Sequence, residues 1–120
     1  MGLGAQAASL AVLRWKYAGP GEGTPADVNR RVARALARAE APGQRTGWAT
    51  RFEHALQVGF IPAGRILAQA GLVPARPLIN CFVQPLGPGD SADGSGGPTL
   101  ADTLDQTART LALGGGVGLD

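Results

Sequence analysis

The sequence predicts an α+β chain, with a helical region over residues 1–71 followed by a strand and a helix over residues 72–120. Three observations predict this fold class. Apolar residues recur at helical spacing as far as Gly71, a short apolar run bounded by prolines follows at 78–83, and a new helical pattern begins near Thr99. With 120 residues in total, the chain has room for one small domain with a modest core.

Two helices are expected in the first third of the chain. The first covers residues 5–17, because apolar side chains recur there every three or four positions. The second begins at Thr24, a residue type favoured at the N-cap, followed by proline at the first helical position and by Asp27. Its inward positions are expected to be Val28, Val32, Ala35, Leu36 and Ala39.

Two further helices are expected before the chain changes character. Pro42-Gly43 ends the second helix, and a third opens at Thr46 or Gly47 and closes at Gly59. A short helix over residues 62–70 then stops at Gly71. The inward side of the third helix is expected to carry Trp48, Phe52, Ala55 and Leu56.

The segment after Pro77 predicts a strand, a loop and a last helix. Residues 78–83 are apolar and partly β-branched, which is typical of a buried strand. Residues 84–98 are rich in glycine and proline and predict a long loop. Thr99 and Asp102 form a capping-box pattern, and the helix that follows has one apolar stripe, formed by Leu100, Leu104, Ala108 and Leu111.

Composition and charge exclude several classes of protein. The net charge of +2 is too small to indicate nucleic-acid binding, and one cysteine excludes an internal disulfide and a cysteine-only metal cage. A single histidine, His54, adds no plausible zinc site. No signal peptide or membrane span is indicated, so the cytoplasm is the expected location.

Cys81 and the glycine cluster at 114–118 are the candidate functional features. By themselves, a thiol in an apolar strand is typical of a small core residue, and glycines after a helix are typical of a helix end and turn. Successive glycines also let backbone amides approach an anion closely. Arginines at 30, 34 and 38 share one helix face, and such a basic stripe could contact phosphates. No aromatic residues interleave with these arginines, which favours a solvated surface instead.

Taken together, these motifs resemble the amino-terminal part of adenosylcobalamin-dependent (class II) ribonucleotide reductase. The resemblance rests on the order and spacing of five segments: Arg14-Trp15-Lys16-Tyr17, Arg31-Val32-Ala33, residues 60–68 with Pro62-Ala63-Gly64-Arg65, Asn80-Cys81-Phe82-Val83, and Gly114-Gly115-Gly116-Val117-Gly118. It covers nearly the whole chain.

The resemblance implies a fold and a set of site residues. Residues 72–120 would begin a ten-stranded α/β barrel whose first strand carries Cys81, one of two cysteines that reduce the substrate. Asn80, Gly115, Gly116 and Gly118 would contact the substrate nucleotide. Asp90 and Ser91 match an Asp-Ser pair that helps to bind an allosteric nucleotide in relatives.

The resemblance also implies a cofactor and partners. The complete enzyme would reduce ribonucleoside diphosphates by thiyl-radical chemistry, with adenosylcobalamin bound by parts outside this segment. It would bind a deoxynucleotide or ATP effector and a thioredoxin-like reductant, and it would form a homodimer, with no nucleic-acid or membrane partner. We expect the 120-residue segment to be inactive alone, since it has one thiol. The alternative from the residues alone is a small non-catalytic helical interaction domain with a structural cysteine.

Overall fold

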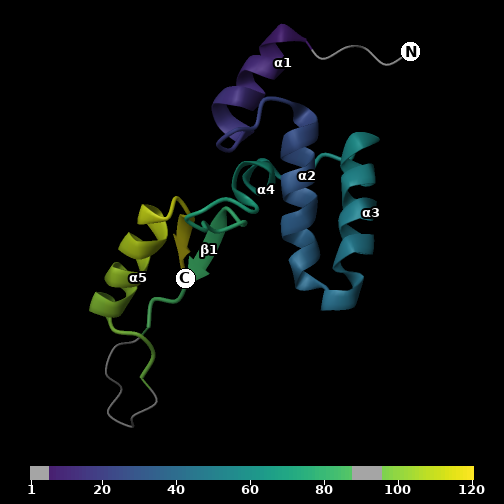
Figure 1. Cartoon of the computed structure of the whole chain (residues 1–120). Helices are drawn as coiled ribbons and strands as arrows, with labels where there is room; N and C mark the ends of the chain where they lie inside the picture. Colours follow the sequence, from purple (N-terminus) through teal and green to yellow (C-terminus); the bar gives the residue numbers. More distant parts are fainter. Residues whose placement is uncertain (1–5, 88–95) are drawn as a thin grey trace. The chain divides into compact units, whose positions relative to one another are not determined.

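The computed structural model describes residues 6–87 and 96–120 (Figure 1). The chain divides into two compact units, Met1–Leu78 and Ile79–Asp120. The domain division expected after residue 71 stays a prediction.

The regular secondary structure in the described part of the first unit is all helical. A π-helical turn extends α1, and short 3-10 turns lie between α2 and α3, which run side by side in Figure 1. The elements are α1 (Ala7–Val12), the π-helical segment Leu13–Tyr17, α2 (Pro25–Leu36), the 3-10 turns Ala37–Ala39 and Pro42–Gln44, α3 (Arg45–Gln57) and α4 (Gly64–Gln69). These confirm the expected order of helices, with α4 shorter than residues 62–70.

Helix α2 supplies most of the core of this unit. The Thr24 hydroxyl accepts a hydrogen bond from the Asp27 amide at 3.2 Å, and the Asp27 carboxylate accepts one from the Thr24 amide at 3.0 Å. This reciprocal capping box fixes where the helix begins. From there Val28 and Val32 are fully buried and pack with Ala70, which follows α4. The position expected at Ala39 is exposed, and Ala37 is buried in its place.

The second unit contains two parallel strands joined through a helix. Strand β1 (Cys81–Gln84) pairs with β2 (Gly116–Leu119), and α5 (Leu100–Ala112) lies between them in the chain. The register places Cys81 beside Gly116 and Gln84 beside Leu119. Both strands run alongside α5 in Figure 1, as expected for a β-α-β arrangement.

Two expectations for this unit were partly wrong. The glycine cluster predicted as a helix end and turn does end α5 at Gly114 and Gly115. From Gly116 on it instead forms strand β2, because hydrogen bonding to β1 stabilises an extended backbone that glycine does not favour by itself. The strand predicted as buried over 78–83 is shorter, and Cys81 and Val83 are exposed, because α5 covers only the opposite face of the two strands.

Helix α5 contacts the strands through threonines rather than through its leucines. Thr103 is buried and its hydroxyl donates to the Pro85 carbonyl at 3.2 Å. In contrast, Leu100, Leu104 and Leu111 are all more than half exposed within this chain. Across residues 6–87 and 96–120, no helix has the length and apolar character needed to cross a membrane.

Candidate functional site

Cys81 opens strand β1 and its thiol is exposed. Successive residues of a strand point to opposite faces. Phe82 and Gln84 contact the helix side, where Gln84 bonds to threonines of α5. The side chains of Cys81 and Val83 therefore lie on the face that α5 does not cover.

Gly116 keeps the space next to the sulfur open. It lies beside Cys81 in the register, and its amide donates to the Asn80 carbonyl at 2.7 Å. A methyl group added at Gly116 would lie 3.4 Å from that carbonyl and 3.9 Å from the Cys81 Sγ. Because Gly118 lies beside Val83 in the same way, this face of β2 is bare backbone next to the cysteine.

Gly115 has a different surrounding from its neighbours. It is buried, and a methyl group there would meet the Phe82 ring and the Thr110 methyl group, each at 2.8 Å. Its amide already donates to the Thr110 carbonyl, and the Gly114 amide donates to Leu111, with Gly114 at a φ of 83°. This pair of bonds is the Schellman arrangement that ends α5 and leads the chain into β2. The substrate contact expected of Gly115 stays a prediction.

Side-chain hydrogen bonds link β1 to α5, and the sequence pattern did not lead us to predict them. The Gln84 amide nitrogen donates to the Thr110 hydroxyl at 2.8 Å, and its oxygen accepts from the Thr107 hydroxyl at 2.9 Å. With Thr103, these threonines recur at positions i, i+4 and i+7. That spacing on one side of the helix is the signal that could have identified the face of α5 that packs on the strands.

The remaining predicted site residues are only partly placed. Asn80 is exposed and directly precedes β1, so its backbone carbonyl is part of the contact with Gly116. Asp90 and Ser91, the expected effector contacts, lie outside the described residues. The structure therefore brings together Asn80, Cys81, Gly116 and Gly118.

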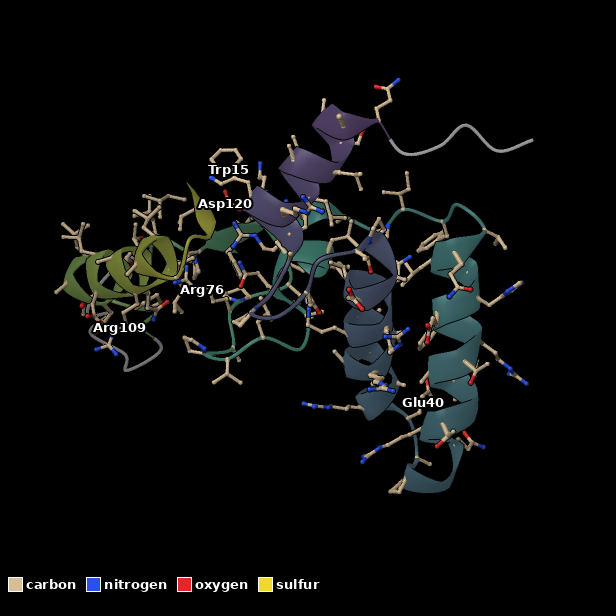
Figure 2. The ribbon with its side chains drawn as sticks, turned by 45° about the horizontal axis from the view of Figure 1, so that its top comes forward. Trp15, Glu40, Arg76, Arg109 and Asp120 are labelled. Carbon is tan, nitrogen blue, oxygen red and sulfur yellow. The ribbon has the colours of Figure 1, made fainter. Side chains whose placement is uncertain are left out.

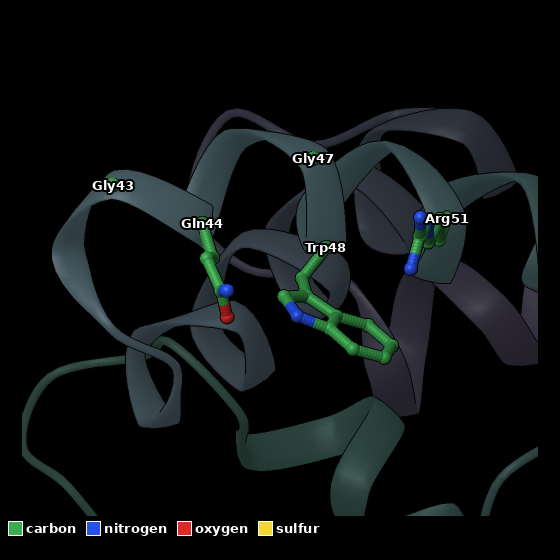
Figure 3. Close-up of a pocket in the computed structure, with 5 residues that line it drawn as sticks. All are labelled: Gly43, Gln44, Gly47, Trp48 and Arg51. Atoms are coloured by element: carbon green, nitrogen blue, oxygen red, sulfur yellow. The ribbon is translucent and has the colours of Figure 1, made fainter.

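The helical unit has a separate hollow of about 300 Å³ at the start of α3 (Figure 3). The Trp48 ring lies between Gln44 and Arg51, and the Arg51 guanidinium is 5.0 Å from the ring centroid. Trp48 also contacts Phe52, with 5.4 Å between ring centroids. These contacts stabilise the exposed side of α3 by cation–π and aromatic packing.

Within the described ranges, no group of three or more His, Cys, Asp or Glu side chains could hold a metal ion. His54 is exposed on α3, as expected for a surface histidine.

Comparison with known protein families decides the family of the chain. The family described as ribonucleotide reductase, all-alpha domain, matches residues 3–74, which is more than half of the sequence. The chain belongs to the ribonucleotide reductase family. The match covers the helices from α1 to α4, and it stops before Cys81. No curated protein and no solved structure gives a significant match.

Membership of the ribonucleotide reductase family explains the helical part of the fold. The helical unit corresponds to the all-alpha domain, and a small two-stranded parallel sheet follows it in the chain. This membership associates the chain with deoxyribonucleotide synthesis.

Proposed function

We propose that this chain is the amino-terminal part of an adenosylcobalamin-dependent ribonucleoside-diphosphate reductase, in which Cys81 is one of two reducing cysteines. The proposal combines family membership with the order of motifs in the sequence, from the Arg14-Trp15 segment to the glycine cluster. Residues 72–120 would begin the catalytic α/β barrel.

The observation that carries the proposal is the open space beside the thiol. Cys81 is exposed on the strand face opposite α5, and the neighbouring strand presents Gly116 and Gly118 there. A ribose could approach the sulfur over this bare backbone, because no side chain of β2 stands in the way. A rigid strand also suits a group that must be held at a defined position.

The chemistry of a cysteine pair fits the reaction. Two thiols are oxidised to one disulfide and supply two electrons and two protons, while the substrate loses its 2′ hydroxyl as water and gains hydrogen at that carbon. Cys81 would supply one sulfur, and the second cysteine would come from another part of the enzyme because this chain has one. A thioredoxin-like reductant would then reduce the disulfide.

The described residues do not form a site that fits adenosylcobalamin. They hold no cluster of metal-ligating side chains, and the single histidine is exposed on α3. We therefore propose that other parts of the enzyme bind the cofactor.

The remaining partners are proposed on the same basis. Each described strand has one partner, so its outer edge is open for the further strands of a barrel. The exposed leucine stripe of α5 is a candidate homodimer contact in the complete enzyme. A deoxynucleotide or ATP effector would bind nearby in sequence, at Asp90 and Ser91.

The decisive experiment replaces Cys81 with serine in the complete enzyme. Serine is close in size to cysteine but cannot form a disulfide, so substrate should still bind and radical formation elsewhere should continue. Deoxynucleotide formation should fall by several orders of magnitude, with free base released from the substrate instead. Both products can be measured in one reaction.

Val83→Ser is the matched control, because Val83 is 75% exposed on the same face and two residues away. This variant should keep normal product formation. A normal deoxynucleotide yield from Cys81→Ser would refute the redox role of Cys81.

A further inference from the structure

The groove between α2 and α3 contains a second hollow, of about 320 Å³, with two arginines in its wall. Arg34 comes from α2, and Arg45 and Thr46 come from the first turn of α3. Ala37 and Ala49 complete the lining. No acidic residue is among these five, and the polar side chains that they contribute are those of Arg34, Arg45 and Thr46. This volume is at the small end of the range for ligand pockets.

The charge of these arginines is not neutralised within the described part of the chain. One turn earlier on α2, Arg30 lies 3.5 Å from the Asp27 carboxylate and 3.7 Å from that of Glu53. Arg34 has no ion-pair or hydrogen-bond partner among the described residues. Arg30 and Arg34 lie on the same face of α2. Arg30 is paired with carboxylates, whereas the guanidinium of Arg34 is available to an anion from outside the chain.

Arg45 is held in place without losing its charge. Its Nε donates to the Glu40 backbone carbonyl at 3.0 Å, which leaves the two terminal nitrogens of the guanidinium for another acceptor. Glu40 lies at the turn between α2 and α3 in Figure 2, and its carboxylate does not line the hollow. Such prior ordering lowers the entropy cost of binding an anion.

We propose that this hollow binds a small phosphate-bearing anion, such as a di- or triphosphate group, between Arg34 and Arg45. A guanidinium fork matches the oxygens of phosphate in two parallel hydrogen bonds. A carboxylate has only two oxygens and satisfies one fork. A phosphate chain presents oxygens on several sides and can serve both forks and the Thr46 hydroxyl together. The site belongs to the helical unit and does not depend on the role proposed for Cys81.

Binding of inorganic triphosphate to the 120-residue chain tests the proposal. The titration is followed by amide chemical shifts at constant ionic strength, for the unchanged chain and three variants. Arg34→Gln and Arg45→Gln should each weaken binding about tenfold, the loss expected for one charge-assisted contact. Arg30→Gln is the matched control on the same helix face and should leave the dissociation constant within about twofold. Circular dichroism confirms that each variant folds, and Arg34→Lys, which keeps the charge but loses the fork, should fall between the unchanged chain and Arg34→Gln.

Two further ligands identify what is recognised. Adenosine triphosphate should compete with inorganic triphosphate, while adenosine should not. Equal weakening by all three glutamine variants, or an absence of saturable binding, would overturn the proposal. Competition by adenosine would also overturn the proposal, because it would indicate recognition of the base. Preferential binding of a single-stranded oligonucleotide that depends on Arg30 would overturn it too, because it would indicate an extended basic surface.

Discussion

Arg31 joins three segments of the helical unit through one guanidinium group. It pairs with Glu22 at 2.9 Å and donates to the backbone carbonyls of Tyr17, Leu67 and Ala70. The side chains of Arg31 and Glu22 are only 11% and 13% exposed. The pair is therefore shielded from water, and the three carbonyls that accept from Arg31 lie near the C-terminal ends of the π-helical segment and of α4, where backbone acceptors lack partners inside the helix.

Arg31→Met should lower the free energy of unfolding by about 3 kcal/mol, because it leaves the Glu22 carboxylate without its partner in a shielded place. Arg38→Met is the control, since Arg38 lies in the 3-10 turn that follows α2, is exposed, and should change stability by less than about 0.5 kcal/mol. Urea unfolding followed by circular dichroism measures both. Equal stability of the two variants would contradict the role of Arg31 in joining the segments.

Gly115 is required by packing. Gly115→Ala should lower stability by about 1–3 kcal/mol, because the added methyl group would collide with the Phe82 ring and the Thr110 methyl group. Gly116→Ala should cost less, since its nearest contacts are at 3.4 and 3.9 Å. Thermal unfolding of the two variants measures both effects. A larger loss of stability for Gly116→Ala than for Gly115→Ala would contradict the assignment of Gly115 as the closely packed glycine.

At the scale of elements, α2 and α5 begin with the same capping box. Hydrogen bonds from the Thr24 hydroxyl, then from the amides of Gly23 and Thr24, hold the pKa of Asp27 below its ordinary value. The Thr99 hydroxyl and amide do the same for the pKa of Asp102. In both helices a threonine and an aspartate three residues later satisfy amides that have no partner inside the helix.

This gives a pH dependence with a defined sign. A carboxylate whose pKa is lower in the folded state stabilises that state above the unfolded pKa, about 3.9 for aspartate. That contribution is lost as the pH falls from about 3.9 through the lower folded pKa. Helix content measured by circular dichroism should decrease over this acid range. The double variant Asp27→Asn, Asp102→Asn should have less helix at neutral pH and a smaller acid transition, and an unchanged transition would contradict the capping contribution.

The sequence predicted the order of helices well because their signals are local. The Thr24 and Thr99 starts and the Gly59 end depend on residues within one or two turns, and the structure places all three as expected, with Gly59 at a φ of 108°. Strand β2 was missed because glycine disfavours extended structure, and only pairing with β1, more than thirty residues away, makes it a strand. The same distance hid the bonds between Gln84 and the threonines of α5.

For the candidate site too, local features could be predicted from the sequence and contacts between distant residues could not. The sequence identified Cys81 and the glycines, and it could not show that Gly116 and Gly118 share a face with the thiol while Gly115 packs against Phe82. That distinction depends on register and on which side α5 covers, and both are long-range properties. The roles of these residues in substrate binding remain predictions.

For the whole molecule, burial is concentrated in the helical unit. The buried apolar residues of the described chain are all found between Val28 and Ala70, whereas β1 and β2 each have one hydrogen-bonded partner. Hydrogen exchange should therefore be slowest in α2 around Val28–Val32 and faster by several orders of magnitude across residues 78–83. Slow exchange across residues 78–83 in a monodisperse monomer would contradict this expectation.

The single accessible thiol also sets a limit on covalent assembly. A chain with one cysteine is monofunctional in the sense of polymer chemistry, because each molecule can contribute to only one bond. Oxidation in air can thus join two copies at Cys81 but cannot extend the product to a third. Any larger species in an oxidised sample must then be held by non-covalent contacts, which detergent would separate without a reducing agent.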